Sequence, residues 1–85
     1  MSSTTVVVGS AVGLHARPAT LIAEAVADSG VPVTLALQGG DPVDAGSALM
    51  IMTLGAEKGM KVVVSSDDQA TLDKIADMVA TDLDA

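Results

Sequence analysis

The 85-residue chain alternates between short β-branched runs and segments with helical spacing, and this order most limits its possible folds. β-Branched residues suit a pleated sheet, whereas apolar residues recurring every three or four positions form one helical stripe. The predicted strands are Thr4–Val8, Val31–Leu37, about Asp41–Asp44 and Lys61–Ser66, and the predicted helices are Ala16–Ser29, Ala48–Leu54 and about Asp68–Leu83. The order β-α-β-β-α-β-α predicts an α+β two-layer sandwich, with one mostly antiparallel sheet covered on one face by helices.

Turn and capping residues predict how these elements end. Gly39-Gly40 suits a tight turn between the second and third strands. Pro42 cannot donate to a β-ladder, so we expect the third strand at the sheet edge. Ser66 with Gln69 resembles a capping box for the last helix. The buried stripe predicted for that helix is Leu72, Ile75, Ala76, Val79 and Leu83, with Asp73, Asp77 and Asp84 facing water.

The composition excludes several classes of function. The net charge of -7, from 11 acidic and 4 basic side chains, argues against nucleic acid and anionic membrane as partners. The chain has no cysteine and no aromatic residue, which excludes disulfides, thiol chemistry and aromatic stacking on bases. It shows neither a signal-peptide pattern nor an apolar run of the roughly 20 residues that cross a bilayer. We therefore expect residues 1–85 to form a single cytoplasmic domain.

Residues Gly13–Thr20 contain the chain's only histidine, His15, and its only arginine, Arg17. Pro18 is tolerated in the first turn of a helix, where amides have no intrahelical acceptor, so it places the helix start near His15. The backbone N–H groups of Ala16 and Arg17, the helix dipole and the guanidinium could all hold a phosphoryl group on the imidazole. We interpret His15 as a phosphoryl acceptor rather than an ordinary surface or capping histidine.

Other chemistries fit the residues less well. One histidine without cysteine leaves only scattered carboxylates as metal ligands, so we expect no metal site. Ser10 and Ser47 are candidate nucleophiles for hydrolysis, but nothing in their spacing links them to His15. The chain also has no Walker-type nucleotide loop. Accepting a group on one nucleophile and handing it on is the simplest remaining use, and it needs no cofactor.

The segment Gly13–Ala19, which reads Gly-Leu-His-Ala-Arg-Pro-Ala, closely resembles the active-site signature of HPr. HPr is the histidine-containing phosphocarrier family of the bacterial phosphoenolpyruvate:sugar phosphotransferase system. The resemblance extends over essentially the whole chain and implies an open-faced β-sandwich, with four antiparallel strands covered on one face by three helices. It also implies a phosphocarrier rather than an enzyme, which takes a phosphoryl group from phospho-enzyme I and passes it to sugar-specific enzyme IIA domains.

The resemblance assigns roles to individual residues. His15 matches the histidine phosphorylated on Nδ1, and Arg17 matches the arginine that assists the phosphoryl group and the docking partner. Pro18 matches the proline that shapes the helix start. The chain departs from the family at Val12, where relatives often carry a small polar residue beside the active histidine.

Ser47 lies in a segment, Gly46–Gly55, that looks like the regulatory-serine region of the family. It matches a serine that an ATP-dependent kinase modifies in some bacteria. Gly46 stands where a lysine is common in relatives. A plain helix cap also explains Ser47, and we favour this structural interpretation over a regulated phosphosite.

The short helix predicted at Ala48–Leu54 is apolar all round, which indicates either full burial or partial exposure to a partner. We expect a transient docking patch around His15, formed by Thr20, Leu21, Ala48, Leu49 and Met52. The alternative is that these residues belong to the core. A carrier that presents one face to large partners is expected to be a monomer. The alternative function is a regulatory docking protein, of a nitrogen branch or of transcription and transport control, switched by phosphorylation.

Overall fold

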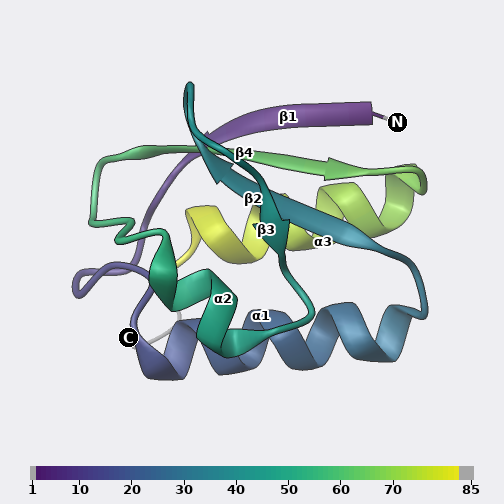
Figure 1. Cartoon of the computed structure of the whole chain (residues 1–85), viewed down its shortest axis with the longest axis horizontal. Helices are drawn as coiled ribbons and strands as arrows, with labels where there is room; N and C mark the ends of the chain where they lie inside the picture. The colour runs from purple at the N-terminus through teal and green to yellow at the C-terminus, as the bar shows by residue number, and fades with distance from the viewer. Residues whose placement is uncertain (1, 83–85) are drawn as a thin grey trace.

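The computed structural model describes residues 2–82 and contains one four-stranded sheet and three helices (Figure 1). The strands are β1 Ser2–Val7, β2 Val33–Leu37, β3 Val43–Asp44 and β4 Lys61–Ser66, and the helices are α1 Ala16–Ser29, α2 Ala48–Thr53 and α3 Gln69–Ala80. The sheet order is β1-β4-β2-β3, and every neighbouring pair is antiparallel. The helices cover one face of the sheet, which confirms the predicted open-faced α+β sandwich.

The core lies between the sheet and the two long helices. Alternate residues of a strand point to opposite faces, so Val62 and Val64 of β4 are buried under the helices while Lys61 is exposed. Ile22 of α1 and Ile75 of α3 reach the same core and have no exposed surface. Each buried side chain of this size stabilises the fold by about 1.5–3 kcal/mol. Aliphatic packing of this kind replaces the aromatic residues that the chain lacks.

The strand that follows α1 is shorter than its apolar sequence predicts. It begins at Val33 rather than Val31, because the Val31 amide donates instead to Ser29 Oγ at 3.1 Å. Pro32 has no N–H for the ladder. The Ser29 hydroxyl also donates to the Val26 carbonyl at 2.6 Å, so it links the end of α1 to this turn.

The predicted tight turn and edge strand are both confirmed. Gly39 has a φ of +82°, and the Gly40 amide donates to the Leu37 carbonyl at 2.7 Å. β3 lies at the edge of the sheet, paired only with β2 among the described strands. It comprises only Val43–Asp44, because Pro42 cannot extend the ladder.

The capping box predicted from Ser66 and Gln69 is wrong. Ser66 is still the last residue of β4, fully buried and paired with both neighbouring strands, so it cannot begin a helix. The N-cap of α3 is Asp68, whose Oδ2 accepts from the Thr71 amide at 3.0 Å and the Thr71 hydroxyl at 2.6 Å. Gln69 instead donates to Asp73 one turn later, at 2.8 Å.

The last helix otherwise follows its predicted pattern. Leu72, Ile75, Ala76 and Val79 are buried, while Asp73 and Asp77 are exposed. The helix ends at Ala80. Leu83 and Asp84, which were predicted to belong to it, lie outside the described residues. Within residues 2–82, no helix combines the length and apolar character needed to span a bilayer.

Candidate functional site

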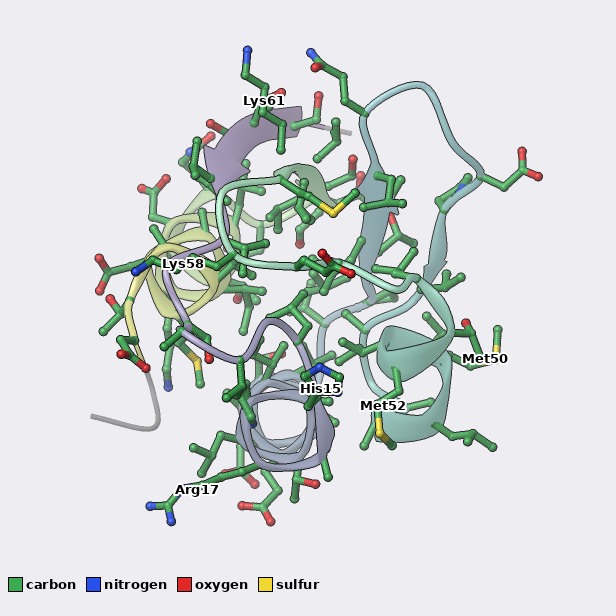
Figure 2. The ribbon with its side chains drawn as sticks, turned by 90° about the vertical axis from the view of Figure 1, so that its left-hand side faces the viewer. His15, Arg17, Met50, Met52, Lys58 and Lys61 are labelled. Carbon is green, nitrogen blue, oxygen red and sulfur yellow. The ribbon has the colours of Figure 1, made fainter. Side chains whose placement is uncertain are left out.

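His15 is the N-cap residue of α1, as the position of Pro18 predicts. Its backbone is extended, with φ of -83° and ψ of -165°, and its carbonyl accepts the Ala19 amide at 2.9 Å. The side chain makes no capping hydrogen bond and is exposed. Figure 2 shows the imidazole on the side of α1 that faces α2. The ring is therefore accessible at the positive end of the α1 dipole.

The residue before His15 is anchored from outside α1. The Leu14 amide donates to the Ala56 carbonyl at 2.9 Å, and both residues are buried. Gly13 has a φ of +77°, and a Cβ atom there would lie 2.5 Å from the Ala56 oxygen. Glycine is therefore required by both its backbone conformation and the close approach. These contacts hold the loop before His15 against the segment that follows α2.

The segment that follows α2 comprises residues 55–60 and is named the 55–60 loop. The Gly59 amide donates to the Val8 carbonyl at 3.1 Å, and the Val8 amide donates to the Met60 carbonyl at 2.9 Å. The Glu57 amide donates to Met60 Sδ at 3.1 Å. Val8, which directly follows β1, thus holds the 55–60 loop, and the loop in turn holds the start of α1. This support could not be predicted from the sequence, because the glycines of the loop indicate turns without indicating which backbone packs on them.

Three basic side chains come from the segments around His15. Arg17 of α1, Lys58 of the 55–60 loop and Lys61 of β4 are all exposed, in a chain with a net charge of -7 (Figure 2). The Arg17 side chain extends from the opposite side of α1, away from His15. The structure therefore brings Arg17 to the same helix end without bringing its guanidinium to the imidazole. No sequence pattern singles out the two lysines, because only the path of the 55–60 loop into β4 determines their positions.

The short helix α2 lies beside the N-terminal end of α1 (Figures 1 and 2). The Ser47 hydroxyl caps it by accepting the Met50 amide at 3.3 Å, which confirms the structural role of this serine. Only Ile51 of this helix is buried. The exposed fractions of Leu49, Met50 and Met52 are 70%, 40% and 37%. Ile51 therefore anchors the helix, Ala48 packs partly against the core, and Leu49 is the side chain that is mostly exposed.

The five residues predicted to form a docking patch are all at least partly exposed. Thr20, Leu49 and Met52 are exposed, and Leu21 and Ala48 are half-buried. They come from α1 and α2, which pack against each other. Thr20, Leu49 and Met52 therefore lie at the surface, while Ala48 also packs partly against the core.

An antiparallel open-faced sandwich with an exposed histidine at the start of its first helix is the arrangement of a small histidine-containing phosphocarrier. A family model described as the PTS HPr component phosphorylation site matches residues 2–81, and the chain belongs to this HPr family. It is 44% identical to the phosphocarrier protein HPr of Streptomyces coelicolor, over 99% of this chain and 94% of that protein.

Solved structures of the family agree with the fold. The phosphocarrier protein HPr of Bacillus anthracis superposes with a TM-score of 0.84 at 25% identity, over 92% of this chain and 95% of that one. HPr-C-His of Thermoanaerobacter tengcongensis gives a TM-score of 0.77 at 24% identity, over 94% and 96% of the two chains. The second likeness concerns the fold alone.

Proposed function

We propose that this chain accepts a phosphoryl group from phospho-enzyme I on His15 and passes it to sugar-specific enzyme IIA domains. The phosphoenolpyruvate-dependent sugar phosphotransferase system would be its pathway. Membership of the HPr family supports the carrier role. The observation that carries the residue assignment is the exposed imidazole of His15, which is at the N-cap of α1 but takes no part in capping.

In the proposed transfer, neutral His15 attacks phosphorus on a partner's phosphohistidine through Nδ1. A new nitrogen–phosphorus bond forms while the bond to the partner's imidazole breaks. The two bonds are chemically alike, so the step is close to balanced and reversible. Rate enhancement then comes from positioning and from electrostatic stabilisation of the phosphoryl oxygens.

The start of α1 supplies that stabilisation in our proposal. The backbone N–H groups of Ala16 and Arg17 lie in the first turn, where an anion also meets the positive end of the helix dipole. The dipole term is worth about 1 kcal/mol at such a position. The Arg17 guanidinium, on a long and exposed side chain, reorients to pair with the phosphoryl group or with the docking partner.

The partners dock, in this proposal, on Thr20, Leu21, Ala48, Leu49 and Met52. An exposed aliphatic surface with a flexible methionine can fit several unrelated partners, and it can release each of them after transfer. The chain then acts as a monomeric, cytoplasmic carrier that is consumed and regenerated stoichiometrically, rather than as an enzyme. It needs no cofactor of its own.

The test is labelling with enzyme I and radioactive phosphoenolpyruvate. We expect one acid-labile phosphate on the wild-type chain and none on His15→Ala, because the chain has no other histidine. Arg17→Ala should be labelled more slowly while keeping its fold. Ser47→Ala is the matched control and should still be labelled. Labelling that survives His15→Ala would show that another residue accepts the phosphoryl group.

A further inference from the structure

Few types of side chain in this protein react readily with oxidants. It contains five methionines but no cysteine, tryptophan or tyrosine. Methionine is oxidised to its sulfoxide by peroxides, and reductases reverse the change. Methionine thioethers are therefore the side chains of this protein that hydroperoxides oxidise most readily. The exposed fractions of Met50, Met52 and Met60 are 40%, 37% and 40%, whereas Met78 is only partly exposed against the core.

Among the exposed methionines, Met52 is the one whose oxidation would change the surface near His15. It lies on α2 on the same face of the molecule as His15 (Figure 2). Its neighbour Ile51 anchors α2 in the core and has no exposed surface. A chemical change at Met52 therefore alters the surface beside the imidazole without disturbing the residue that holds the helix in place.

Met60 provides an internal comparison. It is exposed to the same extent as Met50, but its Sδ accepts a hydrogen bond from the Glu57 amide at 3.1 Å. That bond engages one of the two sulfur lone pairs, and a lone pair is what attacks an oxidant. We therefore expect Met60 to react more slowly than Met50, although solvent reaches the two side chains equally.

We propose that Met52 is a peroxide-sensitive modification site, at which oxidation to the sulfoxide slows phosphoryl transfer by disrupting partner docking. This inference rests on the proposed carrier function and its docking surface. In the reaction, the thioether sulfur attacks one oxygen of hydrogen peroxide and forms a sulfur–oxygen bond. The peroxide O–O bond breaks, and the proton of the oxygen now bound to sulfur passes to the departing hydroxide, which leaves as water. Sulfur loses two electrons, and peroxide gains them.

The effect follows from the change in polarity. The sulfoxide is polar and chiral, so it no longer suits an apolar contact with a partner. Loss of one well-placed interface contact slows transfer by roughly tenfold. The change is reversible, so methionine sulfoxide reductases of both stereospecificities should restore the original rate.

The experiment compares wild-type protein, Met52→Leu and Met60→Leu before and after treatment with dilute hydrogen peroxide. Peptide mass spectrometry follows the gain of one oxygen at each methionine, and circular dichroism checks the fold. Transfer from phospho-enzyme I is measured for each sample relative to its own untreated rate. We expect peroxide to slow the wild type and Met60→Leu by roughly tenfold, and to leave Met52→Leu near its own untreated rate.

The outcomes separate this inference from the carrier function itself. Failure of the untreated wild type to accept phosphate would overturn the carrier function, and with it the proposed effect of oxidation. Normal transfer by folded protein with fully oxidised Met52 would overturn only the inference about Met52. An equal loss in treated Met52→Leu would move the sensitive site elsewhere and overturn it as well. Recovery after reductase treatment would support it.

Discussion

The Leu14 amide and the Ala56 carbonyl are joined by a 2.9 Å hydrogen bond between two buried residues. This bond ties the residue immediately before His15 to the 55–60 loop, which is itself hydrogen-bonded to Val8, the residue that follows β1. The placement of the imidazole therefore depends on a contact between distant parts of the sequence. Helix propensity in α1 cannot supply that placement alone.

The first prediction concerns the close approach of Gly13 to the same carbonyl. Gly13→Ala should reduce the free energy of unfolding by about 3 kcal/mol, because it combines an unfavourable φ with a backbone clash. The displaced loop should also move His15, so phosphorylation by enzyme I should slow. Urea denaturation and the labelling rate measure the two effects.

Gly39→Ala is the matched control for this substitution. Gly39 has a similar φ of +82°, but a Cβ atom there meets nothing within 4 Å. It should cost about 1 kcal/mol from backbone strain and leave the labelling rate unchanged. Equal losses of stability in the two variants would show that the contact with Ala56 contributes nothing.

The second prediction concerns pH and the cap of α3. The hydrogen bond from the Thr71 hydroxyl, followed by that from the Thr71 amide, holds the pKa of Asp68 below its ordinary value. A lowered folded-state pKa stabilises the protein above the unfolded-state pKa of about 4, and this stabilisation is lost as the pH falls through the folded-state value.

Asp68→Asn isolates that contribution, because asparagine can cap a helix but carries no charge. The wild type should be the more stable of the two at neutral pH, and the difference should narrow as the pH falls below about 4. Denaturant titrations across this range measure it. Asp41→Asn corrects for the loss of one exposed negative charge. A difference that stays constant with pH would contradict the assigned role of Asp68.

Local patterns predicted most of the fold because each element is consistent with its own sequence. Val62 and Val64 alternate with outward-facing residues, and Gly30 ends α1 in the left-handed conformation, with a φ of +69°. The errors occurred where side chains compete for the same backbone amides. At the start of α3, Ser66 and Asp68 are both good capping residues, and only the strand pairing of Ser66 decides between them.

The candidate site could be predicted from the sequence only in part. His15 and Pro18 define the start of α1 locally, so sequence alone could locate the exposed imidazole. Arg17 is close in sequence, but the direction of its side chain depends on rotamers that no pattern encodes. The support from Ala56 arises from tertiary packing, more than 40 residues away in the chain, so no local signal could reveal it.

The third prediction concerns the cap of α2. Ser47→Ala should destabilise the protein by about 1 kcal/mol, because the Met50 amide loses its acceptor. Ser47→Asp should largely retain the stability of the wild type, since a carboxylate also caps a helix N-terminus. Thermal and urea denaturation measure both variants. If Ser47→Ala is as stable as the wild type, the 3.3 Å bond contributes nothing measurable.

The fourth prediction tests α2 as a docking surface through Leu49, whose exposed fraction of 70% leaves it little role in the core. Leu49→Gln keeps a good helix former, so the free energy of unfolding should change by less than about 0.5 kcal/mol. Transfer from phospho-enzyme I should nevertheless slow by roughly tenfold, since an apolar contact is lost.

Val7→Thr is the control, because Val7 is 48% exposed but lies on β1, outside the proposed docking surface. Rapid-quench measurements compare the rates; unchanged transfer by folded Leu49→Gln would place docking elsewhere.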